Sequence, residues 1–120
     1  MWKIKKTLIE DACNAAKNYY PKEFMCFLGG EKKTQTIKEI VLMPTENTEE
    51  SASINENVIP FDETIIGTIH SHPGTSNKPS QEDKKFFKKY LINAIICKPF
   101  ETTNTAFYSE KGKEIKAIII

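Results

Sequence analysis

The chain has 120 residues, 39% of them hydrophobic and 28% charged, which suits one compact globular domain. The net charge is only +1 and every one of the 17 cationic side chains is lysine, so neither a basic surface nor the planar arginine fork that binds nucleic acid is expected. No apolar run approaches the roughly 20 residues of a membrane span, and no signal-peptide region opens the chain. We therefore expect a single domain over residues 1–120, located in the cytoplasm, without nucleic-acid or membrane partners.

The first elements are a short strand and a long amphipathic helix. Trp2 and Ile4 alternate with lysines, as in a strand. Thr7 stands three residues before Glu10, the spacing of a helix capping box, and Pro21 ends the helical pattern. Between them, apolar residues recur on one helical face: Leu8, Ile9, Ala12, Cys13, Ala16, Tyr19 and Tyr20.

Strands dominate the middle of the chain. Residues 23–28 are predicted to form a buried strand that ends in a tight turn at Gly29-Gly30. Residues 34–43 form a second strand, with Ile37, Ile40 and Leu42 facing inward. Residues 44–57 are polar and are predicted to be a loop. Residues 64–70 are rich in isoleucine and indicate a strand buried on both faces.

The second half adds one helix and three strands. Ser80 is predicted to open a helix that reaches about Tyr90, with Phe86, Phe87 and Tyr90 inward and four lysines outward. Residues 92–97, 105–109 and 114–120 are predicted strands, the last two separated by a turn at 110–113. This order favours an α/β domain in which helices pack on a mixed β-sheet.

The three cysteines are scattered at Cys13, Cys26 and Cys97, each in an apolar context and none in a CxxC pair. In a cytosolic protein, buried free thiols are the expected state. A bridge between two of them is the alternative.

The stretch from residue 67 to 90, GTIHSHPGTSNKPSQEDKKFFKKY, contains a candidate metal site. His70 and His72 are two apart, so on an extended chain both imidazoles point the same way and can bind one ion. Asp83 falls in the first turn of the following helix and can add a carboxylate. Each part has a simpler interpretation, because a lone His-x-His pair is common and Ser80-x-x-Asp83 is the pattern of a helix capping box. If Asp83 turns toward a metal, its side chain is not expected to serve as the cap.

The conjunction of these parts with an upstream glutamate is more specific. Glu23 in PKEFMCFLGG, the HSHP that ends at Pro73, and PSQED from Pro79 together resemble the JAMM signature of MPN-domain metalloproteases. The resemblance covers essentially the whole chain. It implies an MPN/JAB (cytidine-deaminase-like) fold, with a mixed sheet sandwiched by helices. The H-x-E and P-C-x-x-C signature of zinc deaminases is absent.

By this resemblance, His70, His72 and Asp83 are the ligands of one Zn²⁺, Glu23 is the general acid and base, and Ser80 stabilises the oxyanion. The implied activity is an isopeptidase that releases a ubiquitin-like or small sulfur-carrier-like modifier, with an extended C-terminal tail, from a lysine. Two alternatives stay open, namely processing of a sulfur carrier's C-terminal tail and a non-catalytic MPN-type binding module. The segments that larger relatives expand are short here, which suits a compact prokaryotic, archaeal-type member.

Overall fold

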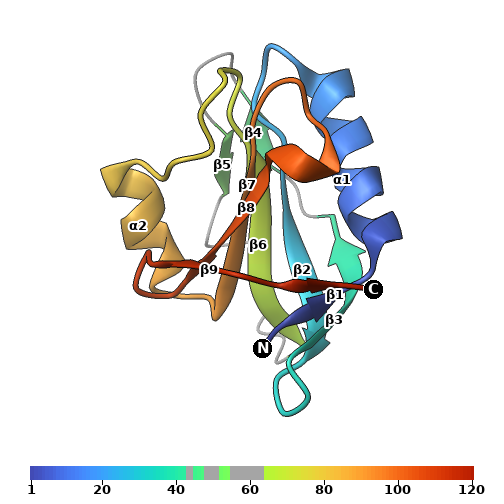
Figure 1. The fold of residues 1–120 in the computed structure, drawn as a ribbon. Helices are drawn as coiled ribbons and strands as arrows, with labels where there is room; N and C mark the ends of the chain where they lie inside the picture. The colour runs from blue at the N-terminus through green and yellow to red at the C-terminus, as the bar shows by residue number, and fades with distance from the viewer. Residues whose placement is uncertain (43–44, 48–51, 55–63) are drawn as a thin grey trace.

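The protein is a curled mixed β-sheet with one α-helix on each side (Figure 1). The computed structural model describes residues 1–42, 45–47, 52–54 and 64–120. The elements in chain order are β1 (Lys3–Ile4), α1 (Lys6–Tyr19), β2 (Met25–Glu31), β3 (Thr36–Val41), β4 (Thr45–Asn47), β5 (Ala52–Ile54), β6 (Ile65–Ser71), α2 (Gln81–Phe87), β7 (Ile92–Ile96), η2 (Thr102–Asn104), β8 (Thr105–Ser109), β9 (Glu114–Ile115) and β10 (Ile118–Ile119).

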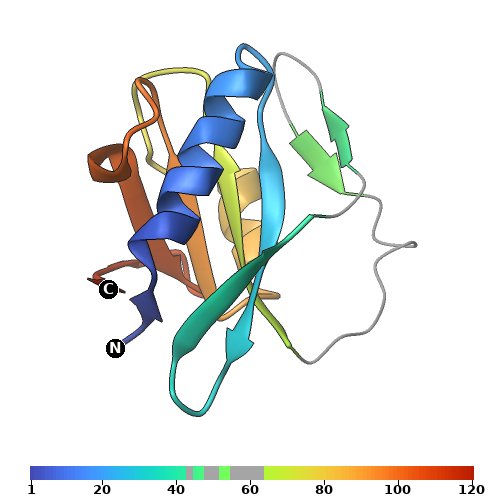
Figure 2. The same ribbon diagram turned by 90° about the vertical axis from the view of Figure 1, so that its right-hand side faces the viewer.

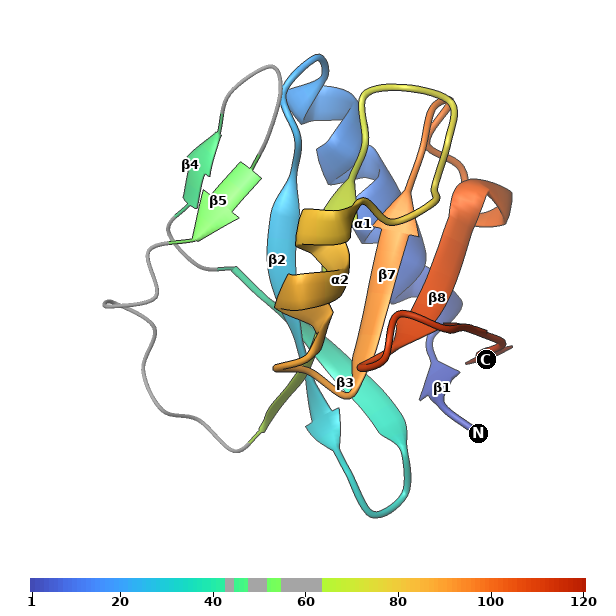
Figure 3. The same cartoon turned by 90° about the vertical axis from the view of Figure 1, so that its left-hand side faces the viewer.

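The main sheet has the strand order β10-β1-β3-β2-β6-β7-β8-β9, while β4 and β5 pair with each other. The pairs β1–β10, β1–β3 and β6–β7 are parallel and the others antiparallel, so the predicted mixed sheet is confirmed. Helix α1 covers one face of this sheet (Figure 2), and α2 lies on the opposite face over its central strands (Figure 3).

Each face of the central strands has its own packing. On the α1 side, the apolar stripe of the helix joins alternate residues of three strands in the larger core: Ile9, Ala12, Cys13, Ala16, Phe24, Cys26, Leu28, Ile69, Ile92, Ala94 and Ile96. On the α2 side, a smaller cluster consists of Phe87, Ile95, Ala106 and Tyr108. Because β6 and β7 are buried on both faces, their sequences are nearly continuous apolar runs.

Helix α1 begins two residues earlier than a cap at Thr7 would place it, so the predicted capping box of Thr7 and Glu10 is wrong. The N-cap is Lys5, whose side chain makes no capping bond. The N–H of Lys6 instead donates to the carbonyl of Ile120 at 2.9 Å. One of the orphan donors of the helix is therefore satisfied by the far end of the chain, which leaves Thr7 inside the first turn.

The predicted turn at Gly29-Gly30 is also wrong, because both glycines lie inside β2. The turn follows at residues 32–35, where Gln35 adopts a positive φ of 51°. The pairing of β2 with β3 shifts register between the two glycines. A Cβ at Gly30 would overlap the carbonyl oxygen of Thr36, so the glycine permits a close approach of β3 rather than a reversal of the chain.

Other boundaries differ more modestly. Of the three side chains expected inward from β3, Ile37 is buried and Ile40 is half-buried, whereas Leu42 is 72% exposed. The predicted polar loop contains the paired strands β4 and β5, and its remaining positions (44, 48–51 and 55–57) lie outside the described residues, as does the end of the second predicted strand at Met43. Strand β6 and its burial are confirmed.

Helix α2 ends at Phe87, three residues before the predicted end, and Tyr90 follows in a turn closed by its N–H bond to the Phe87 carbonyl at 3.0 Å. Residues 114–120 make two short strands rather than one. The three cysteines are free and buried, as expected. Neither α1 nor α2, the α-helices within the described residues, combines the length and the apolar character that crossing a membrane requires.

Candidate metal centre

The end of strand β6 holds the two histidines in the expected orientation. His70 is the penultimate residue of β6, and the N–H of His72 donates to the carbonyl of Ile96 at 2.8 Å, which extends the pairing with β7 past the strand end. Because residues two apart in an extended chain share a face, both rings point to the α2 side. Their Nε2 atoms lie 3.2 Å apart.

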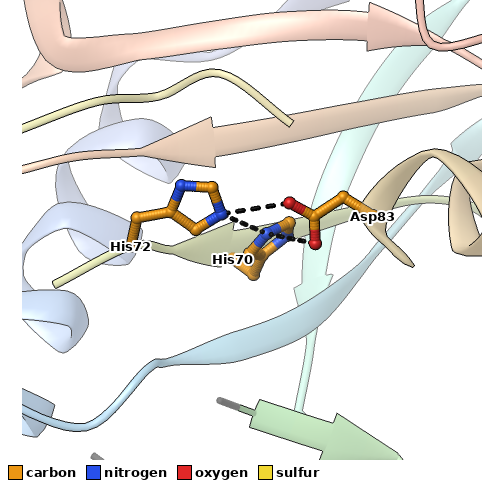
Figure 4. Close-up of side chains that lie close together, drawn as sticks. All are labelled: His70, His72 and Asp83. Atoms are coloured by element: carbon orange, nitrogen blue, oxygen red, sulfur yellow. Dashed lines mark hydrogen bonds and ion pairs between the residues drawn. The ribbon is translucent and has the colours of Figure 1, made fainter. Parts of the chain in front are cut away.

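Asp83 approaches the histidine pair from the first turn of α2 (Figure 4). Its Oδ1 lies 3.3 Å from Nε2 of His70, and its Oδ2 lies 3.1 Å from Nε2 of His72. The His70 side chain is only 3% exposed, while those of His72 and Asp83 are each 20% exposed. The group is therefore buried on one side and open to solvent on the other.

The spacing of these three donors fits a tetrahedral metal ion. Ligands at the usual zinc–nitrogen distance of about 2.0–2.1 Å lie roughly 3.3 Å from one another in a tetrahedron. The Nε2 atoms of His70 and His72 lie 3.2 Å apart, close to this value. Each of them also has one Asp83 oxygen nearby, Oδ1 at 3.3 Å from His70 and Oδ2 at 3.1 Å from His72. Within the part of the chain that the structure describes, His70, His72 and Asp83 form the one cluster of at least three metal-binding side chains.

The outer nitrogens of the two rings have different surroundings. Nδ1 of His72 lies 3.1 Å from the carbonyl oxygen of Ser76, so it carries the proton and leaves Nε2 as a metal donor. Nδ1 of His70 is buried and has no hydrogen-bond partner among the described residues. The His70 ring instead packs near Phe87, with ring centroids 6.3 Å apart.

The electrostatics favour the ionised carboxylate that a metal requires. Burial by itself raises the pKa of Asp83, but hydrogen bonds from His70 and His72 outweigh it and hold that pKa well below its usual range. For His72, burial by itself lowers the pKa. Hydrogen bonds with Asp83 and Ser76 and the negative charge of Glu23 outweigh burial, so the pKa of His72 is raised overall. A metal ion at this cluster would therefore compete with a proton for His72.

Ser80 and Asp83 form the predicted capping box, and the expected conflict between cap and metal site does not arise. The N–H of Asp83 donates to Oγ of Ser80 at 3.0 Å, and the N–H of Ser80 donates to Oδ2 of Asp83 at 2.9 Å. This Oδ2 is the oxygen that also faces His72. A carboxylate offers about four lone-pair sites, so one side chain accommodates both partners.

Glu23 is held beside the histidines by backbone pairing. The ladder between β2 and β6 continues past β2, since the N–H of Ser71 donates to the carbonyl of Phe24 and the N–H of Phe24 donates to Oγ of Ser71, both at 2.8 Å. The next two residues in this register are Glu23, which precedes Phe24, and His72, which follows Ser71. The effect of the Glu23 charge on the pKa of His72 is consistent with this proximity.

Three contributors to the site are not evident from the sequence. The hydroxyl of Ser71 ties down the segment before β2, the backbone carbonyl of Ser76 orients His72, and Phe87 packs near His70. Ser71 belongs to the HSHP motif, but the sequence does not predict that its hydroxyl accepts a hydrogen bond from Phe24. The contact of His72 with the backbone carbonyl of Ser76 could not be predicted, because every residue type has such a carbonyl.

Comparison with known proteins agrees with this geometry. Residues 5–110 match the family described as prokaryotic homologs of the JAB domain. The chain belongs to this family. A curated relative from Haloferax volcanii, named a probable metalloprotease, is 25% identical over 114 residues, which cover 88% of this chain and 71% of the relative. The JAMM-like metalloprotease family predicted from the sequence is therefore confirmed.

Solved structures of other proteins share the fold. A JAB1/MPN domain protein from Archaeoglobus fulgidus is 26% identical with a TM-score of 0.78, covering 100% of this chain and 97% of its own. A second structure, described as JAMM, a metalloprotease-like zinc site in the proteasome and signalosome, is 27% identical with a TM-score of 0.79, covering 100% and 98%. A Desulfitobacterium hafniense protein, at 19% identity and a TM-score of 0.65 over 100% and 93%, shows the fold alone.

Proposed function

We propose that this JAB-domain protein is a zinc-dependent peptidase that hydrolyses the bond between a ubiquitin-like or small sulfur-carrier-like modifier and a lysine amine. The proposal is carried by the convergence of His70, His72 and Asp83, whose donor atoms all lie within 4.8 Å of one another, with Glu23 one residue beyond the last bonded pair of β2 and β6. The zinc-site description of one structural relative supports zinc as the ion.

His70, His72 and Asp83 would hold the ion and leave its fourth position open, as in catalytic rather than structural zinc sites. Zinc, when bound, is a Lewis acid that lowers the pKa of water in this position to about 7. Glu23 would take a proton from the attacking water as the new C–O bond forms, and would deliver it to the amine nitrogen so that the C–N bond can then break.

Ser80 is suited to stabilise the developing negative charge on the carbonyl oxygen. Its Oγ accepts the N–H of Asp83, which uses a lone pair and leaves the hydroxyl hydrogen able to donate elsewhere. The residue is exposed at the start of α2, next to the metal cluster. Donors in this role contribute on the order of 3 kcal/mol to the transition state of other hydrolases.

A modifier with an extended C-terminal tail suits the open side of the site. His72 and Asp83 are partly exposed, whereas His70 is buried behind them, so a substrate reaches the cluster from the surface. An extended tail can present its terminal amide there without unfolding the modifier's body. Tail processing of a sulfur carrier uses the same approach and differs only in which amide is cut.

The test offers zinc-loaded protein a panel of lysine conjugates and tail-extended modifiers, with cleavage followed by mass spectrometry. Wild-type protein is expected to cut at least one conjugate. Glu23→Gln should retain one zinc per chain and lose at least about 100-fold in kcat, because the proton carrier is gone. Cleavage of tail amides alone would identify the processing activity instead.

Glu10→Gln is the matched control, since it removes an exposed carboxylate from α1 and should leave kcat unchanged. Chelation should abolish cleavage and added zinc should restore it. Wild-type turnover by Glu23→Gln would overturn the assigned role. If the zinc-loaded protein binds a modifier without cutting any member of the panel, the non-catalytic module is the better description.

A further inference from the structure

The hydrogen bond between Ser71 and the segment that carries Glu23 is unusual for a strand pair. In an antiparallel ladder, the two residues of a hydrogen-bonded pair normally exchange two backbone hydrogen bonds, but Phe24 and Ser71 have only one. The Ser71 N–H donates to the Phe24 carbonyl at 2.8 Å as expected, but the Phe24 N–H donates to the Ser71 side chain, also at 2.8 Å. The hydroxyl thus takes the place of a main-chain acceptor, and Ser71 itself is only 1% exposed.

The alternation of side chains places this bond behind the site. Met25 and His70 are direct partners in the ladder and so share a face. Phe24 and Ser71, one residue along, turn to the opposite face, where the Phe24 ring belongs to the core under α1. Glu23, one residue further, returns to the face of the histidines. Ser71 therefore acts on Glu23 through the backbone of Phe24.

Phe24 is anchored in three ways, by its ring, its carbonyl and its N–H, and the third anchor depends on one side chain. The ring is 5% exposed and lies 5.5 Å from that of Tyr19 between centroids. Without the Ser71 hydroxyl, the buried N–H of Phe24 must find another acceptor, because an unpaired buried donor is costly. Any such adjustment moves the adjacent Glu23 relative to His72.

We propose that Ser71 is a positioning residue that sets the place of Glu23 relative to the metal ligands, through its hydrogen bond with the Phe24 N–H. The inference rests on the proposed peptidase function for its kinetic part. Its structural part, the dependence of the Glu23 segment on the hydroxyl, can be tested without any substrate. Ser71 itself faces away from the reacting atoms and takes no part in proton transfer.

The test compares Ser71→Ala, which removes the acceptor, with Ser71→Thr, which keeps it. Thr68→Val is the matched control, because Thr68 is a fully buried hydroxyl of the same strand whose bond, 2.6 Å to Asn93, lies away from Glu23. Ser71→Cys, which has a similar volume but a weak acceptor, replaces Ser71→Ala if that variant does not fold. Each variant is measured for zinc content, thermal stability, hydrogen exchange at the Phe24 amide, kcat and KM.

Ser71→Ala is expected to keep one zinc per chain. The protection factor of the Phe24 amide against hydrogen exchange should fall about tenfold, as for the loss of one hydrogen bond. Its kcat should fall by about 100-fold with little change in KM, the effect of a displacement near 1 Å at the reacting groups. Ser71→Thr should retain both properties. Thr68→Val should lower stability without affecting Phe24 exchange or kcat.

Wild-type kcat and Phe24 exchange in Ser71→Ala would overturn the inference, and so would an equal kcat loss in Thr68→Val. Loss of zinc in Ser71→Ala would assign the residue to metal binding instead. If wild-type protein cuts no substrate, the proposed function fails, whereas the exchange measurements still decide whether Ser71 fixes the Glu23 segment.

Discussion

Asp83 serves two structures at once, the N-terminus of α2 and the metal cluster. Its Oδ2 accepts the Ser80 N–H at 2.9 Å and faces His72 at 3.1 Å, while Oδ1 faces His70 at 3.3 Å. The capping box therefore fixes the carboxylate in the orientation in which it faces both imidazoles. Helix capping and the proposed metal binding therefore require the same orientation of this side chain.

Two substitutions at Asp83 separate these roles. Asp83→Ala should lose zinc and also lower the stability of the metal-free protein by about 1 kcal/mol, the usual cost of a lost cap. Asp83→Asn should lose most zinc affinity but keep an amide oxygen for the Ser80 N–H, so its metal-free stability should stay closer to wild type. Metal analysis and thermal unfolding of the metal-free proteins provide the comparison. Stoichiometric zinc in Asp83→Ala would show that the residue is a helix cap only.

At the scale of elements, strand β6 contains His70, leads directly into His72, and is held in place by its neighbour β7. The two strands pair in parallel from Gly67 opposite Ile92 to Ser71 opposite Ile96. A Cβ at Gly67 would overlap the carbonyl oxygen of Ile92. Glycine at position 67 therefore permits an approach of β7 to β6 that a residue with a side chain would prevent. The close contact at one end of β6 thus helps to set the register at the histidine end.

Gly67→Ala is expected to destabilise the protein by about 1–3 kcal/mol, because the added methyl must push a packed backbone aside. Zinc affinity should fall as well, since the register of β6 supports both ligands. Gly74→Ala is the control, as a Cβ there meets no atom within 4 Å. Denaturant unfolding and zinc titration measure both effects; a Gly67→Ala protein as stable as Gly74→Ala would contradict the close-approach argument.

At the scale of the whole molecule, the last described residues close the curled sheet. β9 pairs with β8 at one edge of the sheet, and β10, two residues later, pairs with β1 at the other edge. The N–H groups of Ile118 and Ile120 donate to the carbonyls of Trp2 and Ile4 at 2.7 and 2.9 Å. One segment thereby supplies both edge strands and pairs with β8 and β1, whose free edges would otherwise invite pairing with other chains.

Proline substitutions test this closure. Ile118→Pro removes the donor to Trp2 and should lower stability by about 1–3 kcal/mol, or the melting temperature by roughly 4 °C per kcal/mol. Ile119→Pro should be milder, because alternation in a parallel ladder turns this N–H away from β1. Zinc content should stay unchanged in both, since β10 lies near the chain termini, away from the loop after His72 (Figure 1). Equal melting temperatures for the two variants would argue against the closure.

The elements that could be predicted from the sequence are those whose cause is local. The apolar stripe of α1, the alternation around His70 and His72, and the Ser80–Asp83 cap depend on residues a few positions apart. Two of the predictions that were wrong depend on partners in other elements. Thr7 does not cap α1 because Ile120 supplies an acceptor to Lys6, and Gly30 makes no turn because Thr36 packs against it.

The sequence by itself determined the types of donor and their local spacing, and with them the family and a candidate metal site. Only the tertiary structure decided that Asp83 meets both imidazoles at metal-ligand spacing and that Glu23, 47 residues before His70, is tied beside His72. The physical reason is that spacing along a chain fixes direction only within one helix or strand. The distance between elements is set by packing and by bonds such as that of Ser71 with Phe24, which join residues far apart in the chain.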